Sequence, residues 1–169
     1  MAATNWRQMT EGDIPAVLEI QEEAYPWHQE MREIFEDRLK VYPQGCLVLD
    51  GAEGLDGYIL SHPWTADSPP ALDSKLGTLP ERPTTYYLHD LALLSSAYGQ
   101  GNGARVVRHL AETAGAAGFD TMSLVAVNQS QPFWERHGFS VRTTPELKKK
   151  LESYGRDAVF MTRRLMHEQ

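Results

Sequence analysis

Three glycines between an expected strand and an expected helix form the pattern with the clearest chemical meaning. They alternate in the turn Gly99-Gln100-Gly101-Asn102-Gly103-Ala104. Glycine accepts positive φ and lets the backbone approach a ligand closely. The helix that follows points free N–H groups and the positive end of its dipole at the same space. The turn therefore indicates a phosphate-binding site, with a ligand-free glycine connector as the alternative.

The same turn also fits a dinucleotide-binding fingerprint. Gly99-x-Gly101-x-x-Ala104 matches that pattern, and Asp120 lies about 20 residues further on, as the fingerprint requires. In that fold the acidic residue ends the next strand, whereas Asp120 precedes the strand expected to begin at Thr121. No Gly-Lys-Ser/Thr follows the glycines, so a Walker-type nucleotide loop is not indicated.

Hydrophobic periodicity gives the elements that must position this turn. Strands are expected at 6–9, 46–49, 55–61, 84–94, 121–127 and 158–165, and another begins at 139–141. Helices are expected after Thr10 as N-cap to about residue 24, and over 30–41, 104–117 and 131–137. The stretch 63–83, rich in proline, serine and glycine, is expected to be a long surface loop. This order predicts an α/β sandwich with a mixed central β-sheet flanked by helices, in a single domain spanning residues 1–169.

Composition and charge narrow the class of protein. The chain has 169 residues, of which 41% are hydrophobic and 23% are charged, as in ordinary globular domains. Its formal net charge of −7 argues against non-specific nucleic-acid binding, which needs basic patches. The single cysteine, Cys46, allows no internal disulfide and fits a reducing compartment. Residues 1–7 lack the apolar core of a signal peptide, and no apolar run could span a bilayer. We therefore expect a cytoplasmic protein that binds neither nucleic acid nor membrane.

Two spaced motifs in the segment from about Thr84 to Val141 resemble the GNAT superfamily of N-acetyltransferases. The family carries Gln/Arg-x-x-Gly-x-Gly/Ala between a strand and a helix, and here the turn is Tyr98-Gly99-Gln100-Gly101-Asn102-Gly103. Tyr98 stands where the family usually has Gln or Arg. Downstream, Asn128-Gln129-Ser130-Gln131-Pro132-Phe133-Trp134-Glu135-Arg136-His137-Gly138-Phe139 looks like the family's Asn-…-Phe-Tyr-x-x-x-Gly-Phe segment. The resemblance implies a GNAT-like fold and acetyl-CoA, or a related acyl-CoA, as co-substrate.

The resemblance also implies which residues hold the acyl-CoA. Backbone amides of the glycine turn would bind the pyrophosphate, and the backbone of residues 91–93 would meet the pantetheine arm. Asn128 would hydrogen-bond that arm where two strands splay apart, with an ordinary loop cap as the alternative. The expected co-substrate-binding residues are Leu91, Ala92, Leu93, Tyr98, Gly99, Gln100, Gly101, Asn102, Gly103, Ala104, Asn128, Phe133 and Trp134.

Direct acyl transfer to an amine needs a base, and histidine titrates in the right range. The segment Leu88-His89-Asp90-Leu91-Ala92 resembles the Leu-His-x-Leu-Ala segment of arylalkylamine N-acetyltransferases, whose histidine relays protons. Strand alternation places Tyr87, His89 and Leu91 on one face and Leu88 and Asp90 on the other. His89 is the expected base or relay, with a structural histidine as the alternative, and Asp90 is an alternative polar group facing the substrate.

The residue that would protonate the leaving thiolate is not at its usual place. The resemblance puts Trp134 where the family usually has a tyrosine. An indole N–H only donates hydrogen bonds and cannot act as a proton-transferring acid. Tyr154, which precedes the last expected strand, is the candidate to replace it, with a plain loop tyrosine as the alternative. A thiol with a pKa of about 8.5 is also able to leave unassisted.

Acidic and aromatic side chains lie where the first two expected helices meet. The resemblance implies that this region walls the acceptor site, where such groups would suit a cationic or aromatic amine. Solvated helix-end residues are the alternative. The residues at this meeting point are Glu22, Glu23, Tyr25, Trp27 and His28, while His62 and Trp64 begin the long loop. The expected substrate-binding residues are Glu22, Tyr25, Trp27, His62 and Asp90. The six histidines show no metal-ligand spacing, so we expect no metal. Cys46 lies in an expected buried strand, which argues against an acetyl-cysteine intermediate.

The sequence thus predicts an N-acyltransferase. It would move an acetyl or related acyl group from acyl-CoA to a small amine or amino-acid-like acceptor in a ternary complex. A non-catalytic acyl-CoA-binding or sensing domain is the alternative, because Trp134 replaces the tyrosine. A dinucleotide-binding protein is the third possibility. The expected partner is the small-molecule amine acceptor, and a homodimer is left open.

Overall fold

One mixed β-sheet runs through the computed structural model, which describes residues 5–27 and 29–165. Within those residues the sheet has seven strands in the order β1-β2-β3-β4-β5-β7-β6. β4 and β5 run parallel, and the other neighbouring pairs run antiparallel. The strands are β1 (Trp6–Gln8), β2 (Cys46–Asp50), β3 (Leu55–Trp64), β4 (Thr85–Leu93), β5 (Thr121–Ala126), β6 (Ser140–Val141) and β7 (Val159–Arg164).

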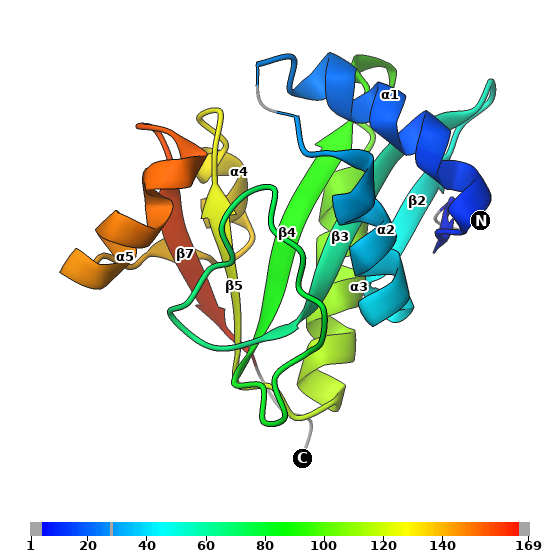
Figure 1. Cartoon of the computed structure of the whole chain (residues 1–169). Helices are drawn as coiled ribbons and strands as arrows, with labels where there is room; N and C mark the ends of the chain where they lie inside the picture. Colours follow the sequence, from blue (N-terminus) through cyan, green and yellow to red (C-terminus); the bar gives the residue numbers. More distant parts are fainter. Residues whose placement is uncertain (1–4, 28, 166–169) are drawn as a thin grey trace.

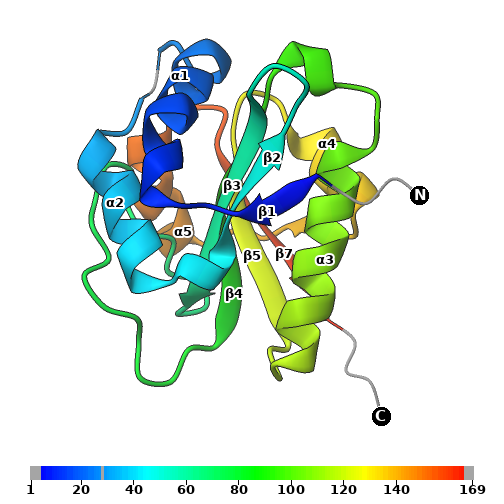
Figure 2. The same cartoon turned by 90° about the vertical axis from the view of Figure 1, so that its right-hand side faces the viewer.

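Helices cover both faces of the sheet, which confirms the predicted α/β sandwich. Figure 2 shows α1, α2 and α5 on one side of the strands and α3 and α4 on the other. We call these the α1/α2 face and the α3 face. The helices are α1 (Ile14–Ala24), α2 (Arg32–Val41), α3 (Asn102–Ala116), α4 (Gln131–Arg136) and α5 (Pro145–Lys150), with 3-10 turns at Glu11–Asp13, Pro43–Gly45, Ser95–Ala97 and Leu151–Tyr154.

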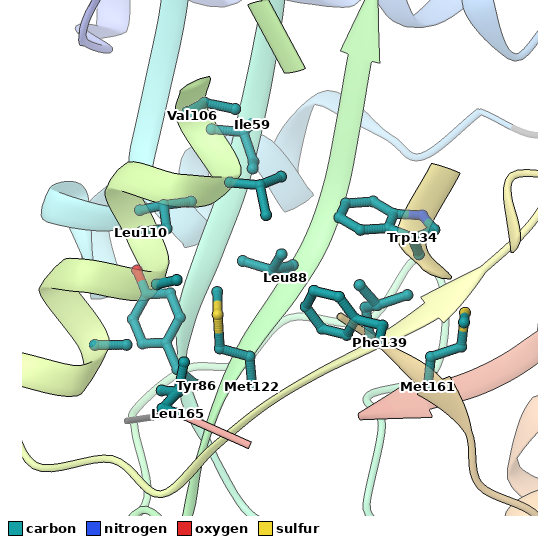
Figure 3. Close-up of a cluster of buried hydrophobic side chains, with 14 of the residues drawn as sticks. Ile59, Tyr86, Leu88, Val106, Leu110, Met122, Trp134, Phe139, Met161 and Leu165 are labelled. Carbon is teal, nitrogen blue, oxygen red and sulfur yellow. The ribbon is translucent and has the colours of Figure 1, made fainter. Parts of the chain in front are cut away.

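The apolar stripe of α3 packs into the main core, as its periodicity predicted. Val106, Val107 and Leu110 are almost fully buried against the α3 face of β4 and β5. Figure 3 shows Trp134 and Phe139 meeting the same cluster around Leu88. A second cluster fills the space between α1, α2 and β2–β3, and a third lies between β5, β7 and α5. The sheet is therefore buried on both faces beside its parallel pair.

Element bounds differ from the expected ones at several places. α2 begins at Arg32 instead of residue 30, and α3 begins at Asn102 inside the glycine turn. β3 continues to Trp64. α5 was not predicted, because Leu147 is its buried residue and three lysines follow, leaving no apolar stripe to read. Its start is capped by the Thr144 hydroxyl, which accepts a hydrogen bond from the Leu147 N–H at 3.1 Å.

Residues 65–84 form the predicted long loop, and polar contacts fix it at both sides. Toward α2, Arg38 donates to the Ser74 carbonyl oxygen at 2.8 Å, and Asp37 accepts from the Leu76 N–H at 2.7 Å. Toward the C-terminal part, Arg142 donates to the carboxylate of Asp67. Figure 1 shows this loop crossing in front of β4 and β5, between α2 and α5. It is therefore an ordered wall of the molecule.

Candidate functional site

The site lies where the parallel strands β4 and β5 separate. Their ladder pairs three residues of each strand and ends at Leu88 and Leu124, after which the strands diverge (Figure 1). Two adjoining cavities of about 310 and 330 Å³ occupy the gap. Both are lined by Tyr25, His89, Asp90, Val125, Val127 and Asn128. His89 and Asp90 are thus among the residues that a molecule in either cavity would meet.

The two cavities differ in their remaining walls. The acceptor-side cavity, as we name the smaller one, is also lined by Gln21, Trp27, Glu30, Leu72, Tyr154, Gly155, Arg156 and Asp157. The turn-side cavity, the larger one, is also lined by Ala24, Leu88, Leu91, Ala92, Leu93, Tyr98, Leu124, Ser130, Phe133 and Trp134. The first is thus rich in charged groups, while the second is mostly apolar.

A β-bulge places His89 and Asp90 on the same face of the sheet. β3 pairs Leu60 with Asp90 and the next residue, Ser61, with Leu88, so His89 has no partner across the ladder. One extra residue of this kind shifts the alternation of side chains by one position. Asp90 accordingly meets Tyr58 on the α1/α2 face, while Leu91 packs against the α3-face cluster. The prediction that Asp90 lies opposite His89, and Leu91 beside it, is therefore wrong.

His89 is paired with an acid from a distant part of the chain. Its Nε2 lies 2.7 Å from Oε1 of Glu30, and the two side chains are 0% and 7% exposed. Nδ1 of His89 is buried and has no hydrogen-bond partner among the described residues. Burial acts to raise the pKa of Glu30, but the charge and hydrogen bond of His89 outweigh it, so the pKa lies below its usual value. Glu30 is therefore a carboxylate beside the imidazole.

Glu30 is itself held in place by four hydrogen bonds within the protein. Gln21 of α1 accepts from the Glu30 N–H at 2.7 Å and donates to the Glu30 carbonyl oxygen at 3.1 Å. Oε2 of Glu30 accepts from the backbone N–H of Asp73 in the long loop at 2.8 Å, and His89 occupies Oε1. The carboxylate therefore links α1, the loop and β4.

Asp90 is a second acid of unusual character. Burial raises its pKa to about 6, although the hydrogen bond from the Tyr58 hydroxyl at 2.5 Å acts in the opposite direction. Tyr25 lies next to it and donates its hydroxyl to the carbonyl oxygen of Leu91 at 2.9 Å. Near neutral pH the site thus contains one firmly ionised carboxylate and one that titrates just below neutrality.

The glycine turn takes the conformation that its composition predicted. Gly99 and Gly101 have φ of 75° and 76°, and Gly101 is the N-cap of α3. Asn102 donates its side-chain amide to the Ala97 carbonyl oxygen at 3.1 Å, and Arg105 donates to the Gln100 carbonyl oxygen at 3.0 Å. The first N–H groups of a helix have no partner within it, and they favour an anion. The turn is therefore preorganised toward phosphate.

The end of β5 carries strained backbone beside both cavities. Asn128 and Gln129 have φ of 55° and 60°, in the left-handed region that non-glycine residues seldom occupy. Such strain often accompanies binding sites. Asn128 lines both cavities, so its position is compatible with the role that the resemblance implied.

A comparison with known proteins decides the family. The profile of the acetyltransferase (GNAT) family matches residues 14–139, which is most of the chain. The chain belongs to the acetyltransferase (GNAT) family. Among curated proteins, no sequence match to the chain is found.

Solved structures share the fold of this GNAT protein at low identity. GphF, a GNAT-like decarboxylase in complex with isobutyryl-CoA, has a TM-score of 0.75 and 14% identity over 95% of this chain and 99% of its own. The ribosomal-protein-S18-alanine N-acetyltransferase of Escherichia coli has a TM-score of 0.67 and 16% identity, over 99% of this chain and 97% of its own. N-acetylglutamate synthase of Neisseria gonorrhoeae, complexed with coenzyme A and N-acetyl-glutamate, has a TM-score of 0.69 and 21% identity. The match covers 99% of this chain and 36% of that protein's chain.

Most of the expected site residues of this GNAT protein come together. The turn-side cavity is lined by Leu91–Leu93, Tyr98, Asn128, Phe133 and Trp134, and Gly103 approaches the Phe133 ring so closely that a Cβ would lie 3.1 Å from it. The acceptor-side cavity is lined by Tyr25, Trp27, His89, Asp90, Asn128 and Tyr154. Residues 99–104 lie at the start of α3 instead of on the cavity walls.

Two expected substrate-binding residues lie elsewhere. Glu22 is exposed on α1 and lines neither cavity. His62 is buried on β3 between Trp64 and Tyr87, with ring centroids 5.3 and 5.6 Å away, and also lines neither. Burial lowers the pKa of His62 to about 3, so it is a neutral core residue. His28, mentioned with this group, lies outside the described residues.

Tyr154 lines the acceptor-side cavity, but its hydroxyl is engaged. It donates to the carbonyl oxygen of Pro70 in the long loop and lies 3.2 Å from the hydroxyl of Tyr87. Burial raises the pKa of Tyr154 above its usual value. As an acid, Tyr154 would first have to leave the Pro70 carbonyl.

Sequence reasoning missed several residues of the site. Glu30 was taken as the start of α2, and Gln21, Leu72, Arg156 and Asp157 were not singled out. Gln21 is a polar residue on the buried face of α1, and the others lie in the α1–α2 connection, the long loop and the turn before β7, where no periodicity reports on position. A signal existed only for Glu30, as an acid just before an amphipathic helix.

Other kinds of site are not evident in the described part of the chain. Across residues 5–27 and 29–165, no group of three or more His, Cys, Asp or Glu side chains could hold a metal ion. In the same residues no helix is both long and apolar enough to cross a membrane. Cys46 is fully buried, and burial raises its thiol pKa to about 12, so it is a poor nucleophile.

Proposed function

We propose that this GNAT protein transfers an acetyl or related acyl group from acyl-CoA to the amine of a small or amino-acid-like acceptor. Transfer would be direct, within a ternary complex. The observation that carries the proposal is His89, which lines both cavities and has a buried Nδ1 without a hydrogen-bond partner among the described residues. A base there could serve an amine in one cavity and a thioester in the other.

The turn-side cavity is the proposed site of the acyl-CoA. The preorganised turn at residues 99–103 would bind the pyrophosphate at the N-terminus of α3. The apolar wall at residues 91–93, with Phe133 and Trp134, would accommodate the pantetheine arm and acyl group. Two neighbours of the same fold were solved with coenzyme A or isobutyryl-CoA, which supports the same class of ligand here.

The proposed chemistry uses His89 as the base. The neutral amine attacks the thioester carbonyl carbon, so a C–N bond forms while the C–S bond breaks and its electron pair leaves with sulfur. The proton lost from nitrogen passes to Nδ1 of His89, which is the free acceptor of the ring. The Glu30 carboxylate stabilises the resulting imidazolium through Nε2. The thiolate leaves either unassisted or after protonation by Tyr154, the acid candidate.

The acceptor-side cavity is the proposed amine site. Its acids, Asp90, Glu30 and Asp157, favour a cation, and the ring of Trp27, which is 69% exposed, lies at its edge. Arg156, which also lines the cavity, is exposed and makes no ion pair within residues 5–27 and 29–165. An amine that also carries a carboxylate, as an amino acid does, would suit this combination. We place the protein in the cytoplasm on its composition.

Ligand-induced thermal shifts test the donor half of the proposal. Coenzyme A or acetyl-CoA at about 100 times Kd should stabilise the fold by about 2.7 kcal/mol, which for a chain of this size raises Tm by about 5–10 °C. NAD and NADP serve as the comparison and should leave Tm unchanged. Stabilisation by neither CoA compound would end the proposal, and stabilisation by NAD would revive the dinucleotide reading.

Turnover tests the acceptor half. Free CoA is measured with acetyl-CoA and a panel of 2-phenylethylamine, spermidine and the twenty free amino acids. His89→Ala should lower kcat for the best panel amine by about 10²–10⁴, the usual contribution of a general base. His109→Ala, which removes an exposed histidine on α3, is the control. CoA binding without any turnover would favour the non-catalytic acyl-CoA-binding alternative.

A further inference from the structure

We infer that Glu30 is a positioning residue for the proposed transfer, holding His89 in the tautomer whose Nδ1 keeps its lone pair free. The inference rests on the proposed function and adds a residue that neither the sequence motifs nor the family resemblance singles out. Glu30 lies 59 positions before His89, yet the two side chains meet at 2.7 Å in the interior.

The tautomer follows from the partners of the two ring nitrogens. A carboxylate only accepts hydrogen bonds, so Nε2 of His89 must carry the proton that it donates to Oε1 of Glu30. A neutral imidazole carries one proton, which leaves Nδ1 as the acceptor. Nδ1 has no partner among the described residues, although it is buried. The pairing therefore leaves an unprotonated ring nitrogen on a residue that lines both cavities.

The geometry requires a carboxylate and not merely a polar side chain. Both oxygens of Glu30 face donors: Nε2–H of His89 at Oε1 and the Asp73 N–H at Oε2. A glutamine in the same place has one acceptor oxygen and one NH₂ donor. Its NH₂ must then face either Asp73 N–H, donor against donor, or His89, which would force the proton onto Nδ1. Glu30→Gln can thus keep both contacts only by moving the His89 proton from Nε2 to Nδ1.

The surrounding fold fixes the carboxylate before any substrate binds. Gln21 clamps the backbone of Glu30 through both its N–H and its carbonyl oxygen. Asp73 contributes twice, because its N–H binds Glu30 and its carboxylate accepts from the Met31 N–H at 2.9 Å. The connection between α1 and α2 and the long loop are thereby locked together around the acid. Positioning of this kind removes the entropic cost of orienting a base.

Other ionisable groups surround the pair, and none of them replaces Glu30. The nearby groups are Asp90 and Tyr87 on β4, His62 on β3, Arg38 on α2 and Tyr154 before β7. Asp90 is bonded to Tyr58, and His62 is neutral in the core. Nε2 of His89 donates its hydrogen bond to Glu30 and to none of these groups. We therefore expect the charge of the His89 ring to depend on Glu30 more than on the other nearby groups.

The decisive experiment compares Glu30→Gln with Glu33→Gln. Glu33 lies three residues further on, in α2, and its side chain is 58% exposed, so it controls for the loss of a charge. For the best amine of the panel, Glu30→Gln should lower kcat at least about tenfold, and by no more than the 10²–10⁴ that the general base itself contributes. The acidic limb of its pH–rate profile should also move to lower pH, because the imidazolium has lost its carboxylate. KM for acetyl-CoA and the thermal shift with CoA should stay unchanged, which also shows that the variant is folded.

Nitrogen-15 NMR of the imidazoles provides a readout that does not depend on turnover. In the ligand-free wild-type protein at pH 8, His89 should show a protonated Nε2 and an unprotonated Nδ1, with the signal assigned by its loss in His89→Gln. Glu30→Gln should shift this signal toward the Nδ1–H tautomer, while Glu33→Gln should not.

The outcomes separate this inference from the proposed function. A wild-type His89 protonated on Nδ1 overturns the inference even if the enzyme is active. Equal kcat and equal pH profiles for Glu30→Gln and Glu33→Gln overturn it as well. Complete absence of amine turnover by the wild-type protein, with the expected tautomer present, overturns the proposed function and the catalytic role of Glu30 with it.

Discussion

Asp90→Asn should change how the stability of this protein depends on pH. Burial raises the pKa of Asp90 from 3.8 to about 6. A group that binds its proton more tightly in the folded state stabilises the fold at low pH. Its contribution is lost as the pH rises from the unfolded value near 4 to the folded value near 6, and it stays lost above that range. Folding therefore becomes less favourable through this window because a buried carboxyl must ionise.

The size of the effect follows from the shift. One pKa unit corresponds to about 1.4 kcal/mol, so a shift of about two units corresponds to about 3 kcal/mol at the limit. Between pH 4 and pH 7.5 most of this, about 2–3 kcal/mol, should appear. Asparagine does not ionise and can still accept from the Tyr58 hydroxyl, which now binds Asp90. The stability of Asp90→Asn relative to the wild type should therefore rise by that amount over this interval.

Urea unfolding of both proteins at pH 4, 6 and 7.5, followed by tryptophan fluorescence, measures the difference directly. Taking the difference cancels the titration of the other carboxylates, including those that destabilise the fold in acid. Asp157→Asn is the matched control, because that side chain lines the same cavity but is exposed to water. A difference between wild type and Asp90→Asn that stays constant across the three pH values would refute the reasoning about the buried carboxyl.

Three further predictions concern residues in or beside the site. Tyr154→Phe, which removes the hydroxyl bound to Pro70, should lower the unfolding free energy by about 1–3 kcal/mol. If this variant loses less than about tenfold in kcat, Tyr154 has a structural role, whereas a loss of about 10² or more assigns it the acid role. Gly101→Ala should cost about 1–2 kcal/mol in urea unfolding because φ is 76° there, and should weaken the thermal shift with CoA. Cys46 is fully buried with its pKa raised to about 12, so an aromatic disulfide reagent should react with it only in unfolding concentrations of urea; fast reaction of native protein would contradict its burial.

The parts of the fold that the sequence predicted are those governed by local rules. The stripe of Val106, Val107 and Leu110 repeats at helical spacing, and α3 buries that stripe. The glycines at 99 and 101 take positive φ, as their type and position between strand and helix indicated. The sequence of elements along the chain, except α5, and the mixed character of the sheet followed from the same periodicities. Local pattern was therefore sufficient for the scaffold and for the turn.

The parts that could not be predicted depend on contacts between distant residues. The predicted face of Asp90 was wrong, because the bulge depends on the register between β4 and β3. The alternation of residue types in the sequence does not show it. The partner of His89 was missed, since Glu30 lies in an irregular connection whose course is set by Gln21 and the long loop. His62 was predicted to bind substrate, but it is buried between the aromatic rings of Trp64 and Tyr87. Tertiary packing decides each of these.

The bulge at His89 interrupts the strand ladder at a residue that lines both cavities. Leu88 and Asp90 already pair with consecutive residues of β3, so a β4 without His89 would form an uninterrupted antiparallel ladder there. Regular ladders are what strand pairing favours. The sheet would therefore be more uniform in a chain one residue shorter, and that chain would lack the ring on which the two cavities converge. His89 is thus the extra residue of this ladder, and its ring bonds Glu30 and lines both cavities.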